Sequence, residues 1–263
     1  MPAFCSGTRA RDGRGVLPAA PTRRCDVRVI VPALNESSSL PSLLRSMPSF
    51  VSDVLVVDNG SSDDTAGVAR AHGARVVREA RRGYGRACLT GIDHVGECDI
   101  LVFVDADSAG ALQSTAALIA PIASGDADFV LGTRRGSAAL SVQQRAGNGL
   151  ACFLMRALWG ACYTDLGPFR AITPAALRRL DMRDEDFGWT VEMQIRAAVA
   201  ALRVVEVAVE DSGRSEGRSK ISGTLAGVCR AGAKILYVIA REAVRDLGAP
   251  VRRLQPEGSI LRG

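Results

Sequence analysis

A short acidic motif, Phe103-Val104-Asp105-Ala106-Asp107, comes at the end of a run of β-branched and aliphatic residues. Two carboxylates separated by one residue at the end of a strand can converge on one hard cation. Mg²⁺ or Mn²⁺ typically binds one or two carboxylates and completes its shell with phosphate oxygens of the substrate. A bare D-x-D motif is common and is otherwise a solvated acidic turn. Its position after a buried strand favours a metal site formed by Asp105 and Asp107.

Polar residues end three other apolar runs. Asn35 and Glu36 follow the first run, Asp58 follows the second and Arg134 ends the fifth. Because ligands of open α/β sheets bind beyond the carboxyl ends of the strands, we expect these residues at the same edge as the acidic motif. Asp58 taken alone, before a glycine and two serines, is explained equally well as a turn-forming residue.

The second half of the chain carries a basic loop, Arg214-x-x-Gly217-x-Ser219-Lys220. Transfer to a hydroxyl requires a general base, whereas a phosphate monoester has a second pKa of about 6 and is already mostly ionised. A phosphate acceptor instead needs cations, and the arginine fork binds phosphate through two hydrogen bonds. The alternative is a solvated basic loop, the usual fate of a charge run. Asp165 and Glu192 are the first carboxylates to test for orienting an acceptor.

Elements that would position these residues follow an alternating pattern. Runs rich in β-branched residues cover 26–32, 53–60, 74–79, 99–107 and 127–134, with helix-start signals between them. Apolar runs of this kind are typical of strands covered on both faces, and their alternation with helices predicts an α/β fold with a mostly parallel sheet. Beyond residue 140 we expect mainly helices, one strand over 203–210 and an amphipathic helix over 222–245.

Length and composition agree with one globular domain. At 263 residues we expect a mobile leader over 1–25, rich in Arg, Gly, Pro and Ala, a single domain over 26–250 and a basic tail over 251–263. Aromatic residues make up only 5% of the chain, which disfavours a stacking platform for single-stranded nucleic acid. The formal net charge of +5 suits an anionic ligand or an acidic membrane surface.

Cysteine spacing and hydropathy indicate where the protein works. The seven cysteines form no CxxC pair, which argues against a zinc site or a disulfide framework and favours reduced thiols. The N-terminus has no apolar signal region, and charges interrupt the best candidate membrane span. We therefore expect a cytoplasmic protein. For the helix over 222–245, core packing is the main interpretation, and contact with a membrane surface is the functional alternative.

Seven motifs in register resemble family 2 glycosyltransferases, in particular the branch of polyprenyl-phosphate (dolichyl-phosphate) mannosyl- and glucosyltransferases. They are VIVPALNE, VLVVDNGSSDDT, RRGYGRACLTGI, VFVDADS, TDLGPFRAI, FGWTVEMQIRA and RSEGRSKISGT, and the resemblance covers roughly residues 27–240. The resemblance implies a GT-A fold, a UDP- or GDP-sugar donor, Mg²⁺ or Mn²⁺, inversion at the anomeric carbon, and a polyprenyl phosphate acceptor at the cytoplasmic membrane face.

The resemblance also implies roles for individual residues. The residues lining the nucleotide pocket would be Pro32, Ala33, Asn35 and Glu36, with Asp58 on the base and Gly83, Gly85 and Arg86 beside the nucleotide. Asp105 and Asp107 would hold the metal on the diphosphate. The residues gathering phosphates of donor and acceptor would be Arg134, Arg145, Arg214, Ser219 and Lys220. Ala109 stands where related enzymes often have an amide ligand, so fewer protein ligands or a water would complete the metal shell.

Three alternatives remain. The acceptor could be a soluble hydroxyl compound, which would demand a carboxylate base. A dinucleotide-binding oxidoreductase is suggested only by Gly83-Tyr84-Gly85, but Cys88 replaces the final glycine of that fingerprint and no acid follows at the required strand end. A non-catalytic nucleotide-sugar-binding relative is disfavoured by the intact acidic motif and arginine loop.

Overall fold

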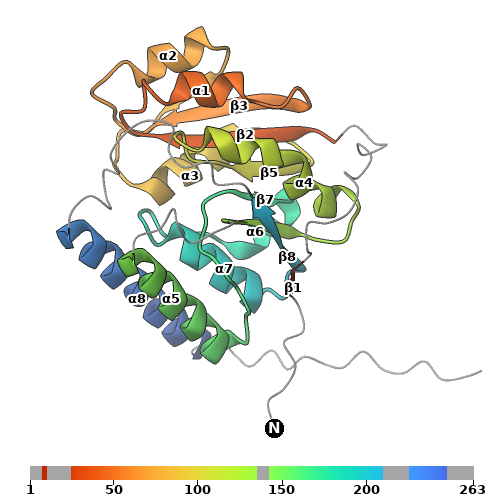
Figure 1. Cartoon of the computed structure of the whole chain (residues 1–263), viewed down its shortest axis with the longest axis vertical. Coiled ribbons are helices and arrows are strands. Elements are labelled where there is room, and N and C mark those ends of the chain that lie inside the picture. The colour runs from red at the N-terminus through yellow and green to blue at the C-terminus, as the bar shows by residue number, and fades with distance from the viewer. Residues whose placement is uncertain (1–7, 11–24, 135–141, 210–224, 248–263) are drawn as a thin grey trace, which may run out of the picture.

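The computed structural model describes residues 8–10, 25–134, 142–209 and 225–247, which surround one twisted sheet (Figure 1). Its order is β1-β8-β6-β7-β5-β2-β3-β4. The strands are β1 (Thr8–Ala10), β2 (Val27–Ala33), β3 (Val51–Asp58), β4 (Arg75–Arg78), β5 (Ile100–Phe103), β6 (Phe129–Arg134), β7 (Arg170–Ile172) and β8 (Val204–Val209). All the pairings are parallel except those of β7, which runs antiparallel to β5 and β6.

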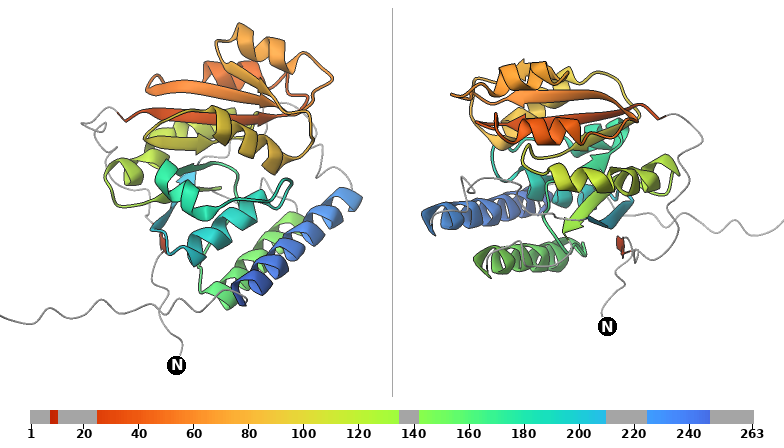
Figure 2. Two further views of the ribbon diagram at one scale, coloured as in Figure 1. Left: turned by 180° about the vertical axis from the view of Figure 1, so that it is seen from behind. Right: turned by 45° about the horizontal axis from the view of Figure 1, so that its top comes forward.

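Helices cover both faces of the sheet (Figures 1 and 2). One face carries α1 (Leu40–Arg45), α2 (Thr65–Ala71), α4 (Thr115–Ala123) and the 3₁₀ helix η1 (Ala109–Ser114). The other carries α3 (Tyr84–His94), α5 (Val142–Trp159), α6 (Pro174–Leu180), α7 (Trp189–Val199) and α8 (Leu225–Leu247). The last of these, α8, packs against α5 and α7.

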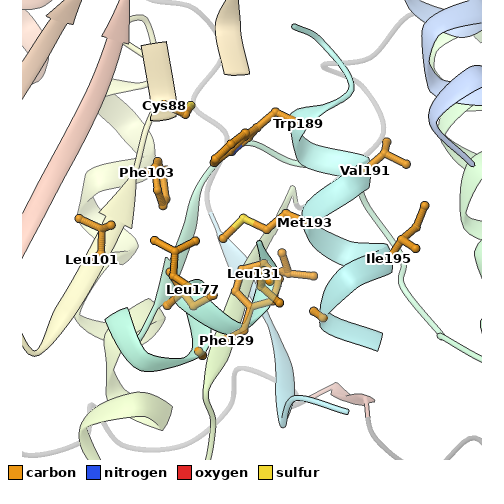
Figure 3. Packing of buried hydrophobic residues seen from close by; sticks show 14 of the residues in the cluster. Cys88, Leu101, Phe103, Phe129, Leu131, Leu177, Trp189, Val191, Met193 and Ile195 are labelled. Atoms are coloured by element: carbon orange, nitrogen blue, oxygen red, sulfur yellow. The ribbon is translucent and has the colours of Figure 1, made fainter. Parts of the chain in front are cut away.

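The core residues alternate between the two faces, as the period of two along a strand requires. In β2, Ile30 packs with α3 and α7, whereas Val29 and Val31 pack with α1 and α4. On the α7 side, the rings of Phe103 and Trp189 lie 6.1 Å apart, centroid to centroid (Figure 3). The expectation of strands buried on both faces is therefore confirmed.

The structure also corrects the expected pattern. The five alternating runs and the run over 203–210 all form strands, and the expected helix over 222–245 is α8. The antiparallel strand β7 was not expected, because three residues are too short for a periodic signal. Within the segment predicted to be a mobile leader, Thr8–Ala10 pairs with β8 at the sheet edge. Apart from Cys25, the rest of that leader and the basic tail lie outside the described residues.

Two further expectations concern cysteines and membrane spans. Cys162 is disulfide-bonded, so the expectation of reduced thiols is wrong at this position. Spacing in the sequence does not report which cysteines fold close together, and this explains the error. Four others, Cys25, Cys88, Cys98 and Cys152, are free. Among the described residues, no helix combines the length and apolar character that a membrane span needs.

Candidate active site

The carboxyl ends of the central parallel strands meet at one edge of the sheet. Ala33, the last residue of β2, pairs with Asp58, the last residue of β3. In β5, Phe103 pairs with Ile30, so Asp105 follows two residues beyond that pair and reaches the same edge. The predicted gathering of strand-end residues is therefore present at the ends of β2, β3 and β5.

Hydrogen bonds join the loop after β2 to the loop after β3. Asn35 adopts a left-handed backbone with φ 55°, and its backbone amide donates to Ser61 Oγ at 2.9 Å. The side-chain oxygen of Asn35 accepts from the amide of Ser62 at 2.7 Å. The Glu36 amide donates to Thr65 Oγ1 at 2.9 Å. These bonds fix the two loops relative to each other, next to the end of β2, where Pro32 and Ala33 are buried.

Asp58 has a clear structural role. It is 6% exposed, and its Oδ1 accepts a hydrogen bond from the Ser61 amide at 2.9 Å. The next residue, Asn59, accepts from the Gly83 amide at 2.8 Å and donates to the Arg81 carbonyl at 2.7 Å. The turn-forming role of Asp58 is thus observed, and its contact with a nucleotide base stays a prediction.

The loop before α3 requires glycine at two positions. A Cβ atom would lie 2.1 Å from the Glu185 carbonyl oxygen if added to Gly83, and 2.0 Å from that of Asp184 if added to Gly85. The Arg86 amide donates to the same Glu185 carbonyl at 2.9 Å. Gly83 and Gly85 therefore allow this loop to pack against the backbone of 184–186, and their predicted contact with a nucleotide stays a prediction.

The side chain of Arg86 is engaged with two acids. It forms ion pairs with Glu79 at 3.0 Å and with Glu185 at 3.5 Å. Glu79 also accepts from the Thr90 hydroxyl at 2.6 Å. This hydroxyl is the largest cause of the lowered pKa of Glu79, to which the charge of Arg86 also contributes. The two ion pairs anchor α3 to the residue after β4 and to the loop before α7. They do not test the predicted place of Arg86 beside a nucleotide.

Tyr84 fixes the first carboxylate of the acidic motif. Its hydroxyl donates to Asp105 Oδ1 at 3.0 Å. Burial, together with the nearby charge of Asp105, raises the pKa of Tyr84 well above its usual value, so the phenol stays protonated and acts as the donor. Asp107, two residues on, is half-buried and accepts from the Ser108 hydroxyl at 3.3 Å.

The oxygen ligands offered here suit a hard cation. Asp105 and Asp107 supply carboxylates, and Ala109 begins η1 without a side-chain ligand. In the described part of the chain, no group of three or more His, Cys, Asp or Glu side chains is arranged to hold a metal. Two carboxylates with substrate phosphate oxygens are the usual set for Mg²⁺, so the residues fit a metal that binds together with its nucleotide.

Arg134, predicted to bind phosphates, and Asp165, predicted to orient the acceptor, form one ion pair. The guanidinium of Arg134 donates to both carboxylate oxygens, at 2.8 and 2.6 Å. Asn148 of α5 and the Leu166 amide add bonds at 2.9 and 2.8 Å. Burial alone would raise the pKa of Asp165, but the hydrogen bonds and charge of Arg134 outweigh it and hold the pKa below its usual value.

A buried arginine, Arg170, lies on β7, the strand between β5 and β6 in the sheet. It is 1% exposed and donates to the carbonyls of Gly167 and Thr190. Its guanidinium lies over the ring of Phe129, 5.9 Å from the centroid. Burial is the main cause of its lowered pKa. The residue joins the loop before β7 to the start of α7.

Glu192 occupies the centre of a buried ionic cluster. Its side chain is fully buried, and one oxygen accepts the amides of Arg183 and Asp184 at 3.0 and 2.7 Å. The other oxygen accepts from Arg241 of α8 at 2.8 Å and lies 3.2 Å from Arg196. Glu192 therefore anchors α7, α8 and the loop between α6 and α7, and its predicted contact with an acceptor stays a prediction.

The remaining predicted phosphate ligands are placed only in part. Arg145 is exposed on α5. Arg214, Ser219 and Lys220 lie outside the described residues.

Several residues of the site were not found from the sequence. Tyr84 was noticed only as the residue between two glycines, and Arg170 only within a motif. Asp184, whose carboxylate binds Lys234 at 3.0 Å, carries no sequence signal, because its partner lies 50 residues away.

Comparisons with known proteins agree with this geometry. The model of a family described as glycosyl transferase family 2 matches residues 28–163. An uncharacterized glycosyltransferase of Mycobacterium tuberculosis is 39% identical over 203 residues, which is 76% of this chain and 92% of the relative. The undecaprenyl-phosphate mannosyltransferase of Micrococcus luteus is 31% identical over 219 residues, covering 76% of this chain and 89% of that enzyme.

A solved structure shares the fold. Glucosyl-3-phosphoglycerate synthase from Mycobacterium tuberculosis, in complex with Mn²⁺, UDP and glucosyl-3-phosphoglycerate, superposes with a TM-score of 0.74 at 22% identity. The superposition covers 94% of this chain and 89% of that one. The same synthase has also been solved with Mg²⁺ and UDP.

Proposed function

This chain belongs to glycosyltransferase family 2, and from that premise we propose that it transfers a sugar, with inversion, from a UDP- or GDP-sugar to a polyprenyl phosphate. Its similarity to the undecaprenyl-phosphate mannosyltransferase supports the lipid phosphate as acceptor. The proposed place of action is the cytoplasmic face of the membrane in which that lipid resides.

The observation that supports a phosphate acceptor is the environment of Asp165 and Glu192, the two carboxylates predicted to orient the acceptor. Asp165 accepts two hydrogen bonds from Arg134, and Glu192 is fully buried among amides and arginines. A general base must reach the proton that it removes and have a pKa near the working pH. Neither carboxylate meets this condition, because the pKa of Asp165 is lowered and Glu192 is enclosed. A phosphate acceptor is already mostly ionised at neutral pH and needs no general base, so it agrees with this arrangement.

On the donor side, the chain would hold the nucleotide sugar by its diphosphate. Asp105 and Asp107 would bind Mg²⁺ or Mn²⁺, with Tyr84 setting the orientation of Asp105. A bound divalent cation neutralises the diphosphate and stabilises it as the leaving group. The joined loops that carry Asn35, Glu36 and Asp58 would form the nucleotide pocket.

On the acceptor side, cations would hold the lipid phosphate close to the anionic donor. Arg145, Arg214 and Lys220 are proposed for this role, with Ser219 as a hydroxyl donor. Arg134 would contribute through its charge at the edge of the site, since its guanidinium is paired with Asp165.

The experiment is a transfer assay with purified protein, UDP- and GDP-sugars, and either polyprenyl phosphate or soluble hydroxyl acceptors, with and without Mn²⁺. Arg145→Ala and Arg214→Ala should each slow transfer to the lipid by roughly one to two orders of magnitude, the effect of losing one charged hydrogen bond. Asp165→Asn and Glu192→Gln should be milder per folded molecule. If one carboxylate change abolishes activity while Arg214→Ala is tolerated, the acceptor is a soluble hydroxyl compound and the proposal fails.

A further inference from the structure

The C-terminal helix α8 is apolar on two opposite sides. Val238 and Ile239 are buried against the core. On the other side, Leu236, Tyr237 and Val244 are 44%, 59% and 70% exposed. The expected core packing of this helix accounts for the first side only, and the side chains on the second side are exposed in the described part of the structure.

Helix α5 repeats this arrangement beside α8. Its inner residues Ala151 and Met155 are buried, whereas Leu150, Phe153 and Leu158 are 47%, 65% and 52% exposed. The two helices lie side by side at one end of the molecule in each view (Figures 1 and 2). Of the eight large apolar side chains exposed in the described residues, six lie on these two helices. We call these six the outer face: Leu150, Phe153, Leu158, Leu236, Tyr237 and Val244.

The charges on the two helices indicate what covers the outer face. In their described parts, Arg145, Arg156 and Arg245 are exposed and Asp246 is the only exposed acid. An exposed apolar surface on two helices with an excess of exposed arginines complements a bilayer with anionic headgroups, because the acyl region takes up the apolar side chains and the headgroups attract the cations. Tyr237 and Phe153 add aromatic rings, which are favoured at the membrane interface.

The two helices that carry the outer face are joined to Asp165 and Asp184 by other side chains. Asn148 of α5 donates to Asp165 at 2.9 Å. Arg241 and Lys234 of α8 bind Asp184, which lies in the loop that packs against Gly85. A surface on which these helices lie would present its lipids at α5, which carries Arg145, one of the residues proposed to hold the acceptor phosphate.

We propose that the outer face of α5 and α8 docks on an anionic lipid bilayer and so brings the site to a membrane-embedded acceptor. This inference rests on the proposed function, since a lipid acceptor is what makes docking useful. The docking step itself needs neither donor nor acceptor and can be measured without them.

The test is cosedimentation of the full chain with vesicles of phosphatidylcholine alone or mixed with phosphatidylglycerol, without nucleotide sugar or polyprenyl phosphate. The wild type should bind the mixed vesicles, more weakly at high salt because screening weakens the attraction. Phe153→Ser with Tyr237→Ser should lower partitioning about tenfold or more, since two large apolar groups no longer enter the bilayer. Arg156→Glu should lower binding to mixed vesicles only.

The matched control is Phe50→Ser, which removes an aromatic side chain that is 43% exposed between α1 and β3. It should bind vesicles as the wild type does. The proposal is overturned if the wild type does not bind, or if the double variant binds as well as Phe50→Ser. It is also overturned if light scattering shows a wild-type dimer that the double variant converts to a monomer, because a second copy then covers the outer face. Vesicle binding by an enzyme that glycosylates only soluble acceptors would refute the proposed function and leave the docking result standing.

Discussion

Tyr84 donates a hydrogen bond to Asp105 Oδ1 at 3.0 Å, so the first carboxylate of the acidic motif is held by a residue 21 positions earlier in the chain. Tyr84 is also the first residue of α3, directly after Gly83, whose close contact with Glu185 fixes the start of that helix. The orientation of a proposed metal ligand therefore depends on the packing of the glycine loop.

We first predict that Tyr84→Phe weakens metal binding. Removal of a partner that orients a ligand typically costs 10- to 100-fold in metal affinity or activity. The concentration of Mn²⁺ that gives half-maximal transfer should rise by roughly this factor. The matched control is Tyr163→Phe, which removes a buried hydroxyl that donates to the Gln194 carbonyl at 2.9 Å. Equal Mn²⁺ requirements in the two variants would contradict the role given to Tyr84.

Asp107→Ala should abolish transfer and leave the fold intact. The residue is half-buried beyond the end of β5 and has little core packing to lose, but without it the cation retains one protein carboxylate. Turnover and thermal unfolding would be compared with Asp126→Ala, an acid located between α4 and β6. Full wild-type activity in EDTA would refute the metal site.

Removing one partner of the ion pair between Arg134 and Asp165 should destabilise the fold more than removing both. Arg134→Ala leaves the carboxylate of Asp165 without its charged partner, which should lower the free energy of unfolding by about 3 kcal/mol. The double variant Arg134→Met with Asp165→Leu should recover much of this loss, because no buried charge is left unpaired. Urea unfolding of the wild type, Arg134→Ala and the double variant checks this order of stability, and a double variant that is no more stable than Arg134→Ala would contradict the pairing.

The described part of the fold was largely predictable, whereas the contacts within the site were not. The apolar runs are continuous because helices cover both faces of the sheet, and this produces a strong sequence signal. In contrast, Arg134 and Asp165 are 31 residues apart, and Glu192 meets Arg241 across 49 positions. Such pairs depend on tertiary packing. The sequence shows that each residue is charged but does not show which residue it pairs with. For the same reason, Glu192 was assigned to an acceptor although its side chain is enclosed.

Acid should weaken the connection between α2 and the loop after β2. Burial alone would raise the pKa of Asp63, but the hydroxyls of Thr65 and Ser37 and their backbone amides lower it to about 2. An unfolded Asp has a pKa of about 3.9. The stabilisation is therefore complete above about pH 4 and is lost as the pH falls from there toward 2. The difference in urea midpoint between wild type and Asp63→Asn should shrink between pH 6 and pH 3. A difference that stays constant would exclude this carboxylate as the cause.

Glu192→Gln should primarily affect stability. A glutamine has one oxygen and one NH₂ group where Glu192 places two oxygens, one facing the amides of Arg183 and Asp184 and the other facing Arg241. In either orientation, the NH₂ group of the glutamine faces another donor, either the backbone amides or the guanidinium of Arg241. We therefore expect the free energy of unfolding to fall by about 3 kcal/mol, comparable to breaking a buried charged pair. Transfer by the folded fraction should keep its KM for polyprenyl phosphate, because the side chain is fully buried. Asp107→Asn should show the opposite result, a stable protein without turnover. A tenfold higher acceptor KM for Glu192→Gln at unchanged stability would instead return Glu192 to the acceptor site.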